Sequence, residues 1–394
     1  MDKKPEKLVP EVRFKGFTDD WEQRKFLDEI DSIIDYRGKT PKKLGMSWSK
    51  TGYLALSALN VKNGWIDKES NDSHFGNQAL YDIWMKSTPL YKGQVVFTTE
   101  APMGNVAQIP DNEKYILSQR TIAFNPSQRL IDGFLADLLS TKKIQNELMS
   151  LATGGTAKGV SQKSLKFLKI AFPNTEEQNF IHKVIKLLQT FITLQQRKLN
   201  QLKRLKTAML QQLFTDKNSK QPNLRFKNFR GDWEQRKLKS VVSVNSGKDY
   251  KSLEKGNVPV YGTGGYITSV SKFLSSQDAI GLGRKGTINK PYILKAPFWI
   301  VDTLFYLTLK PENILTFIYS LIQKINWLQY DESTGLPSLS KKNIENVLVS
   351  LTKLDEQQKI GKVIVKLDKF ITLQQSKIDQ LTILKKYLLQ KLFI

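Results

Sequence analysis

The sequence predicts an α+β fold in which two globular mixed α/β domains are separated by two long antiparallel helices, with the halves related as a pseudo-twofold internal repeat. Three observations lead to this prediction. One long stretch occurs twice, a second motif is also duplicated, and the segments between these repeats differ. The chain therefore consists of two halves that share their ends but not their middles.

The longer duplicated stretch has the pattern of an amphipathic helix. FITLQQRKLNQLKRLKTAMLQQLF at 191–214 matches FITLQQSKIDQLTILKKYLLQKLF at 370–393 at a constant offset, without a gap. Apolar residues recur every three or four positions, as on one helix face. We expect packing between the helices through Ile192, Leu199, Leu202, Leu205, Met209, Leu213, Ile371, Ile378, Leu381, Leu384, Leu388 and Leu392.

The length of these helices requires a partner for the apolar face. The match extends upstream to Glu177 and Glu356, and a helix from Glu177 to Phe214 would measure about 57 Å at roughly 1.5 Å per residue. A helix of this length cannot bury its own stripe, so the other copy is the most economical partner. Gln195 and Gln374 interrupt the stripe, and we interpret them as a polar layer that fixes register.

The second duplicated motif precedes each variable middle. RFKGFTDDWEQRKF at 13–26 matches RFKNFRGDWEQRKL at 225–238. The offset between these copies is larger than the offset between the helical copies, so the first middle must be longer than the second. We expect Trp21 and Trp233 to pack on the long helices while the charged side chains of DWEQRK face solvent.

The middles read as short strands and turns with some helix. YLALSALNV and GQVVFTT in the first half have strand character, and a helix is expected from Ile131 to Met149. The second half runs from VPVYGTGGYIT and AIGLGRKGTI to a helix expected near Leu315 to Trp327. Ser161 corresponds to Ser340 at the helix offset, so the repeat resumes before each long helix.

These boundaries divide the chain into five parts. The globular heads are expected at 1–172 and 225–352, and they are followed by helices within 173–214 and 353–394. The polar stretch TDKNSKQPN lies in the linker, 215–224.

Composition favours nucleic acid as the partner. The formal charge of +24 exceeds what solubility requires and indicates an extended anionic ligand, with DNA ahead of a membrane surface. The chain has no Cys, which excludes disulfides and zinc fingers and fits a reducing cytosol. The N-terminal residues do not resemble a signal peptide, and no apolar run has the length of a membrane span. We expect a soluble cytoplasmic protein.

Catalytic motifs are missing from the sequence. The two His residues do not support a catalytic triad or a metal site. GLGRKG at 281–286 matches G-x-G-x-x-G, but TINKPY follows it instead of a helix that would receive a phosphate. There is no P-loop and no [DN]-P-P-[YFW] tetrapeptide of the kind that holds a flipped adenine. We therefore predict a binding protein with no catalytic residues, no bound metal and no cofactor of its own.

Basic residues and glycines recur together in the loops of both heads. Glycine permits close approach of the backbone, Lys neutralises phosphate, and Arg or Asn can bond to base edges. Each loop by itself could equally be a solvated turn, but the set, weighed with the net charge, favours DNA contact. The candidates are Tyr36, Arg37, Lys39, Lys42, Lys158, Lys248, Lys251, Arg284, Lys285, Asn289 and Lys290.

The whole chain resembles the DNA specificity subunit of Type I restriction-modification systems. FKGFTDDWEQRK and FKNFRGDWEQRK look like the lead-ins to that family's target recognition domains, which would be the two heads. YRGKTPK with YLALSALNVKNG, and VYGTGGYI with IGLGRKGTINKP and PFWIVDTLFY, look like segments inside those domains. EQ followed by a helix that ends KRLKTAMLQQLF or TILKKYLLQKLF looks like the conserved helical spacer.

The resemblance implies a division of labour. Each head would read one half of an asymmetric bipartite site in double-stranded DNA, and the antiparallel helices would set the unread gap. Two methylation subunits would dock on the shared parts and use S-adenosylmethionine, while restriction subunits would use ATP and Mg. Two other classes remain: a two-headed DNA-binding architectural scaffold without a methyltransferase partner, and a self-contained nuclease or methyltransferase.

Overall fold

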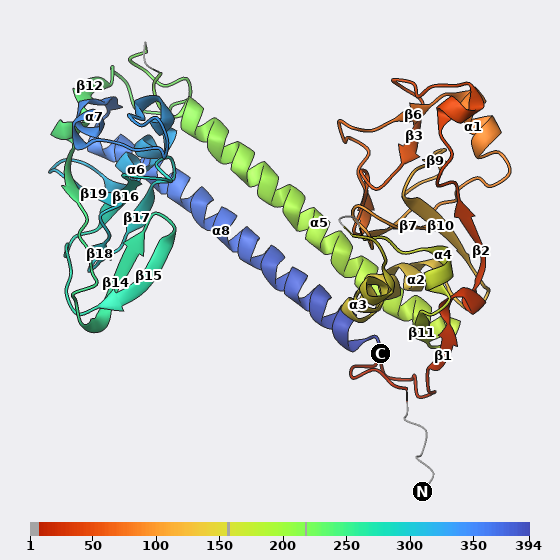
Figure 1. The fold of residues 1–394 in the computed structure, drawn as a ribbon. Coiled ribbons are helices and arrows are strands. Elements are labelled where there is room, and N and C mark those ends of the chain that lie inside the picture. The colour runs from red at the N-terminus through yellow and green to blue at the C-terminus, as the bar shows by residue number, and fades with distance from the viewer. Residues whose placement is uncertain (1–7, 156–157, 217–218) are drawn as a thin grey trace, which may run out of the picture. The chain divides into compact units, whose positions relative to one another are not determined.

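The protein forms two compact units. The structure is a computed structural model that describes residues 8–155, 158–216 and 219–394. Unit 1 contains the described residues up to Leu194 together with Ile378–Ile394, and unit 2 contains those within Gln195–Lys377. The long helices α5, Thr175–Gln212, and α8, Leu354–Lys391, each have 38 residues (Figure 1). Each helix therefore begins in one unit and ends in the other.

Unit 1 is built on a four-stranded antiparallel sheet with the order β2-β10-β7-β8. A three-stranded sheet, β6-β3-β9, and the pairs β1-β11 and β4-β5 complete the unit. The strands are β1 Glu22–Lys25, β2 Ile30–Asp35, β3 Tyr53–Leu56, β4 Val61–Lys62, β5 Trp65–Ile66, β6 Phe75–Gly76, β7 Val95–Thr98, β8 Val106–Gln108, β9 Ile116–Leu117, β10 Thr121–Pro126 and β11 Lys169–Phe172.

Unit 2 repeats this plan with fewer strands. Its four-stranded antiparallel sheet has the order β13-β19-β16-β17, beside a three-stranded sheet, β15-β14-β18, and the pair β12-β20. The strands are β12 Glu234–Lys237, β13 Val242–Ser246, β14 Lys255–Gly262, β15 Gly265–Val270, β16 Ala279–Gly283, β17 Tyr292–Leu294, β18 Trp299–Ile300, β19 Leu304–Leu309 and β20 Leu348–Leu351. The heads thus differ in sequence but share a framework.

The short helices correspond only in part, because among the described residues unit 1 has more of them than unit 2. Unit 1 contains α1 Gln78–Trp84, α2 Asp132–Leu139, α3 Lys142–Leu151 and α4 Gln162–Leu165, and unit 2 contains α6 Leu315–Lys324 and α7 Lys341–Asn346. The side chains of Ser161 and Ser340 accept from backbone N–H groups at the starts of α4 and α7, which satisfies donors that a helix start leaves free. Among the described residues, no helix is long and apolar enough to cross a membrane.

The structure corrects two expected helices. The segment from Ile131 to Met149 is not one helix, because it is divided between α2 and α3. The Thr141 side chain accepts from the backbone N–H of Ile144 and starts a new helix there. In unit 2, α6 ends at Lys324, and a separate 3-10 turn follows at Trp327–Tyr330.

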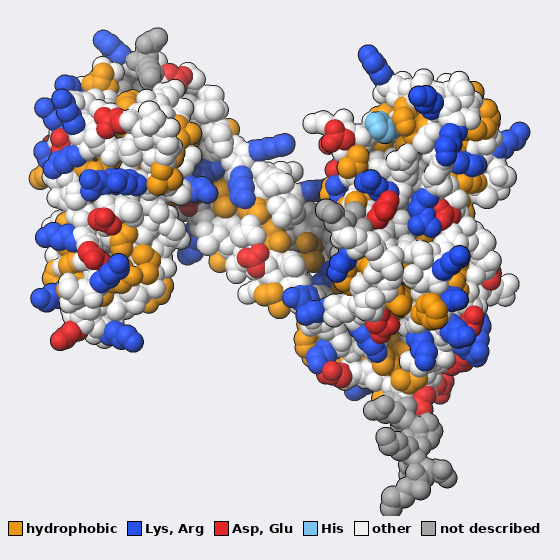
Figure 2. Space-filling model, viewed as in Figure 1, with side chains coloured by type: hydrophobic (Ala, Val, Ile, Leu, Met, Phe, Trp, Pro, Cys, Tyr) orange, Lys and Arg blue, Asp and Glu red, His pale blue; other side chains and the backbone are white. Residues whose placement is uncertain are grey.

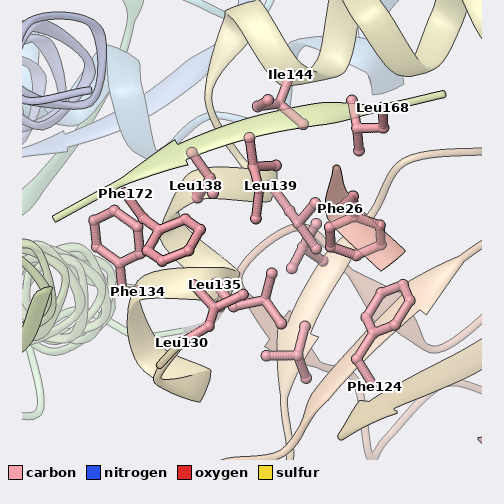
Figure 3. Close-up of a cluster of buried hydrophobic side chains, with 14 of the residues drawn as sticks. Phe26, Phe124, Leu130, Phe134, Leu135, Leu138, Leu139, Ile144, Leu168 and Phe172 are labelled. Carbon is pink, nitrogen blue, oxygen red and sulfur yellow. The ribbon is translucent and has the colours of Figure 1, made fainter. Parts of the chain in front are cut away.

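Aromatic and aliphatic side chains fill the core of unit 1 between α2 and the sheet. Phe134, Leu138 and Leu139 of α2 are all buried and gather in one cluster with Phe26 (Figure 3). The ring of Phe26 meets that of Phe124 edge to face, with the centroids 5.2 Å apart. The apolar face of α2 therefore anchors the head against the elements that precede the long helix.

Each DWEQRK Trp packs where the end of a long helix reaches a head. In unit 1, the Trp21 ring lies 5.8 Å from Phe134 and 6.3 Å from Phe393, just beyond the end of α8. In unit 2, the Trp233 ring lies 5.7 Å from Phe317 and 6.1 Å from Phe214, just beyond the end of α5. The following EQRK residues form β1 and β12 and are exposed. The expected arrangement of this motif is confirmed.

The two long helices run antiparallel within each unit. In unit 1, Lys385 of α8 donates to the side chain of Gln189 of α5 at 2.8 Å. In unit 2, Lys206 of α5 pairs with Asp368 of α8. Lys206 and Lys385 are equivalent positions of the helical repeat, and so are Gln189 and Asp368. Both units therefore use the same pair of positions.

The linker between the halves is attached to unit 2 by its described residues. The N–H of Leu224 donates to the carbonyl of Gln212 at 2.8 Å, and the N–H of Trp233 donates to that of Lys220 at 2.8 Å. Residues 217 and 218 of the predicted linker lie outside the described residues. The linker is therefore partly a structural element that positions the lead-in of the second head.

Candidate nucleic-acid interface

All eleven candidate DNA-contacting residues lie outside the strands, in loops near the ends of the four-stranded sheets. Tyr36, Arg37, Lys39 and Lys42 follow β2, and Lys158 precedes α4. Lys248 and Lys251 follow β13, while Arg284, Lys285, Asn289 and Lys290 lie between β16 and β17. Lysine and arginine side chains are distributed over the visible surface of both units (Figure 2).

Hydrogen bonds bring four loops of unit 1 together, and we call their described residues the first loop cluster: 36–43, 99–105, 118–120, and 153–155 with 158–160. The N–H of Thr99 donates to the carbonyl of Arg120 at 2.8 Å, and the N–H of Val160 donates to that of Thr99 at 2.9 Å. Glu100 and Gly159 form an antiparallel bridge. Lys158 directly precedes Gly159, whose backbone is held by this bridge to Glu100.

The turn after β2 is joined to this cluster by Asp35. Gln162 donates to Asp35 Oδ2 at 2.8 Å, and Arg37 Nε donates to Asp35 Oδ1 at 2.9 Å. Burial is the largest single influence on the Asp35 carboxyl and raises its pKa, but the hydrogen bonds and charge of Arg37, together with the hydrogen bond from Gln162, hold the pKa below its ordinary value. Arg37 is therefore held in place by a carboxylate, with 29% of its side chain exposed.

Other side chains of the first turn have simpler settings. The Lys39 ammonium lies 4.2 Å from the centre of the Tyr36 ring, which is a cation–π distance. Lys42 is exposed on the short 3-10 turn Pro41–Leu44. The fixed turn thus presents one aromatic ring and several cations on the same short segment.

Unit 2 contains an equivalent set, which we call the second loop cluster: residues 247–251, 284–290, 301–303 and 331–338. The N–H of Arg284 donates to the carbonyl of Thr303 at 2.8 Å, and the N–H of Leu339 donates to that of Arg284 at 2.9 Å. Lys285 and Ser338 form an antiparallel bridge. Each of these contacts has a counterpart in unit 1.

The backbones of the two clusters correspond residue by residue. Val160 and Leu339 are equivalent positions at the helix offset, and each donates to the residue that directly follows β7 or β16. Glu100 of unit 1 is therefore structurally equivalent to Lys285 of unit 2, and Arg120 is equivalent to Thr303. The two heads present different side chains on one backbone frame.

The predicted residues of the second loop cluster are partly fixed and partly exposed. The Arg284 guanidinium lies 5.6 Å from the centre of the Phe305 ring. The carbonyl of Lys248 accepts from Trp299 Nε1 at 2.9 Å, whereas the side chains of Lys248 and Lys285 are exposed. Lys251 lies on a turn, and its backbone N–H donates to Asp249 Oδ1 at 3.2 Å. Asn289 and Lys290 are exposed farther along the same connection.

Sequence reasoning missed Glu100, Arg120 and Thr303. Glu100 Oε1 lies 3.3 Å from Arg120 Nε, with 46% and 51% of the two side chains exposed. Neither residue lies in a glycine-rich basic loop, which is the pattern that predicts the other DNA-contacting candidates. The correspondence of Ser161 with Ser340 could have been extended backwards to align the adjoining loops, but the bridge to Glu100 is visible only in three dimensions.

The predicted packing residues of the helices fall into two groups. Leu199, Leu213, Ile378 and Leu392 are buried, and Ile192, Leu202, Met209, Ile371, Leu381 and Leu388 are partly buried. Leu205 and Leu384, which are equivalent positions, are each 43% exposed. They lie six residues beyond Leu199 and Ile378, which places them about 120° around the helix. The buried stripe therefore excludes these two residues.

Comparison with solved structures matches the fold. The S subunit of a Type-I restriction-modification system from M. genitalium aligns over 98% of this chain and 99% of its own, with a TM-score of 0.69 and 20% identity. A chain from a study of complex assembly and conformational transition of the type I R-M system aligns over 95% and 97%, with a TM-score of 0.53 and 14% identity.

Sequence comparison gives the same family. The putative type I restriction enzyme MjaX specificity subunit of Methanocaldococcus jannaschii is 22% identical, over 95% of this chain and 93% of its own. The MjaVIII specificity subunit of that organism is 25% identical over 60% of this chain, and the match spans about half of its length, 52%. The model for the Type I restriction modification DNA specificity domain matches residues 18–204 and 230–382. With two such domains over most of its length, the chain belongs to the family of Type I restriction-modification DNA specificity subunits.

Proposed function

We propose that this specificity subunit reads an asymmetric bipartite site in double-stranded DNA, with one half-site for each head. The observation that carries the proposal is the pair of loop clusters, in which one backbone frame displays different side chains in the two units. A shared frame with variable side chains is what two independent base-reading surfaces require, because base edges give sequence information and the frame does not. The charge of +24 supports binding to the DNA backbone.

We also propose that the long helices carry docking sites for two methylation subunits. Unit 1 exposes Phe191, Leu194 and Leu384, and unit 2 exposes the equivalent residues Phe370, Leu373 and Leu205. Phe191 and Phe370 are both 45% exposed, although large apolar side chains on a helix normally turn towards a core. Phe191 and Leu194 lie on one helix face, and the same patch occurs once in each unit. Two equivalent patches support two identical partners.

The chemistry of the complex is assigned to these partners in our proposal. The two heads and two helices account for most of the described chain, and the subunit supplies DNA sequence specificity without a catalytic group of its own. Methylation subunits would bring S-adenosylmethionine, and restriction subunits would bring ATP and Mg. Because the substrate is the DNA of the cell, we place the complex in the cytoplasm.

Replacement of one head tests the reading function. Residues 239–352 are exchanged for the corresponding segment of another family member, and the chain is co-expressed with its methylation subunit in a host that lacks adenine methylation. Sequencing of methylated positions should show one half-site changed and the other retained. Changes in both half-sites would contradict independent reading, and the absence of any bipartite motif in the parent protein would contradict the proposed function.

Charge placed in one docking patch tests partner binding. With Phe191→Glu and Leu194→Glu, we expect complexes that retain one methylation subunit, as measured by native mass spectrometry. The equivalent pair, Phe370→Glu and Leu373→Glu, should remove the other one. Asn200→Glu adds one such charge at another exposed helix position and serves as the control. Full assembly in both patch variants would exclude this face, and a scaffold without a methyltransferase would fail to assemble even as the parent protein.

A further inference from the structure

Glu100 differs in charge from its counterpart in the other head. Glu100 and Lys285 each lie two residues beyond a central strand, and each bridges to the loop before α4 or α7. The backbone at both positions has the same partners, so packing of the frame does not demand either side chain. The choice of a carboxylate in unit 1 and an ammonium in unit 2 calls for an explanation outside the fold.

An exposed carboxylate at a DNA-binding surface has an electrostatic cost. The chain carries a net charge of +24, and phosphate binding favours Lys and Arg at such positions. Glu100 opposes this attraction while it remains 46% exposed within the first loop cluster. A carboxylate accepts hydrogen bonds and does not donate them, so its useful role towards DNA is to accept from an amino group on a base edge.

Arg120 supplies the complementary function beside it. Arg120 Nε lies 3.3 Å from Glu100 Oε1, and 51% of the Arg120 side chain is exposed. The backbone of Arg120 is fixed because its carbonyl accepts from Thr99 at 2.8 Å. The Glu100 carboxylate, which accepts, and the Arg120 guanidinium, which donates, are thus held side by side. Both side chains remain about half exposed.

A single C·G base pair presents groups in the major groove that complement both side chains. Cytosine presents its N4 amino donor, and guanine presents the O6 and N7 acceptors, to which Arg binds in a bidentate manner. An A·T pair offers Arg no such two adjacent acceptors on one purine, because the adenine N6 group is a donor. We propose that Glu100 and Arg120 together read one C·G base pair in the first half-site, an inference that rests on the proposed function.

The test measures selectivity at one base pair and uses the whole complex. Parent protein, Glu100→Gln and Arg120→Lys are each co-expressed with the methylation subunit, and methylated positions are mapped genome-wide. We expect preference for C·G at one position of the half-site read by unit 1 to fall about ten-fold to one-hundred-fold in both variants. The second half-site should be unchanged. Arg120→Lys keeps the charge but loses the bidentate fork, so its effect separates base reading from phosphate attraction.

Two controls are available within the chain. Glu113→Gln removes an exposed carboxylate that pairs with Lys68 elsewhere in the same head, and it should leave both half-sites unchanged. Lys285→Ala alters the equivalent position of unit 2 and should change only the second half-site. Because the Glu100 and Arg120 side chains are about half exposed, the conservative variants should fold, and assembly with the methylation subunit verifies this.

Several results would overturn the inference while leaving the proposed function intact. These are a first half-site without a C·G pair, unchanged selectivity in both variants, or equal strengthening of binding to all DNA by Glu100→Gln, which would reduce Glu100 to a source of phosphate repulsion. If the parent protein yields no bipartite motif at all, the proposed function fails and the inference fails with it.

Discussion

The side-chain amide of Gln374 donates to Oε1 of Gln195 at 2.6 Å, and the two residues occupy the same position of the helical repeat. This hydrogen bond therefore joins equivalent positions of the two copies of the helical repeat. Gln374 is only 8% exposed and also donates to the backbone carbonyl of Gln195. A buried polar layer of this kind specifies which residues of the helices face each other, at some cost in stability.

Removal of one member of this layer should destabilise the protein. In Gln374→Leu, the Gln195 side chain keeps its polar atoms but loses their partner, and we expect the free energy of unfolding to fall by about 1–2 kcal/mol. The double variant Gln195→Leu with Gln374→Leu should recover most of this loss, because both polar groups are gone. Chemical denaturation of the parent, Gln374→Leu, Gln195→Leu and the double variant completes a double-mutant cycle and measures the coupling. A single variant more stable than the parent would contradict the predicted role.

A buried ion pair ties each lead-in to the start of a long helix. Arg13 donates to Glu177 through two nitrogens at 2.8 and 2.7 Å, and Glu177 is 1% exposed. Arg13→Ala leaves this carboxylate buried without its partner, so we expect a loss of about 3–5 kcal/mol of stability. The exposed pair between Arg24 and Glu22 provides the control, since Arg24→Ala should cost at most about 1 kcal/mol. Similar unfolding midpoints for the two variants would refute the distinction.

The pH dependence of stability should carry a contribution from Asp137. Burial is the largest influence on this carboxyl and raises its pKa, although its hydrogen bond with His182 at 2.8 Å acts in the opposite direction. The folded protein then binds the proton more tightly than the unfolded chain does. Stability therefore falls as pH rises from the ordinary Asp value of about 3.9 through the raised pKa. At lower pH, where both states are protonated, the carboxyl has no such effect.

Asp137→Asn should remove this fall. The amide keeps a hydrogen-bonding partner for His182 but cannot ionise, so the variant should gain stability relative to the parent as pH rises through this window. Unfolding midpoints between about pH 3.5 and pH 7, around the ordinary Asp value, give the comparison. Lys385 and Lys186 lie near enough to interact with this carboxyl, and they are retained in both proteins. A constant difference between variant and parent across the range would show that Asp137 does not titrate there.

The elements that the sequence predicted well are those with long repetition. A constant offset over the whole duplicated stretch identifies the helices because every turn repeats the same face. The same spacing predicts that Leu205 and Leu384 belong to the buried stripe, since they continue its steps of three and four residues. Both are 43% exposed, because six residues beyond Leu199 or Ile378 the helix has turned to another face. Spacing alone does not give the width of the face that a partner covers.

The loop clusters could be predicted only in part. Glycine and lysine mark individual turns, so Lys158 and Arg284 could be selected from local composition. Glu100 and Arg120 join the cluster through a bridge and a hydrogen bond between segments far apart in sequence. Such contacts depend on the order of strands in the sheet, and the variable middles have no repeat from which to infer that order.

Arg284→Ala should affect one half-site. The guanidinium packs over the buried Phe305 ring, so part of the side chain is held while its donors remain available to DNA. If it reads a base, selectivity at one position of the second half-site should relax by about 1–3 kcal/mol. Competition binding with duplexes altered at single positions measures this. Equal loss of affinity for unrelated DNA would instead identify Arg284 as a phosphate contact, with a reduced dependence on salt.

Lengthening both helices at their midpoint should lengthen the unread gap. Four residues inserted after Gln196 and four after its equivalent, Gln375, add about 6 Å of helix, or about two base pairs at roughly 3.4 Å each. The matched insertion preserves the pairing of Lys206 with Asp368 in unit 2 and of Lys385 with Gln189 in unit 1. It separates Gln195 from Gln374, which lie on opposite sides of the inserted residues. Mapping of methylated sites should show both half-sites unchanged and a longer gap. An insertion in α5 alone cannot keep both pairings, so we expect a smaller increase and weaker methylation. Altered half-sites with the original gap would exclude the helices as the spacer.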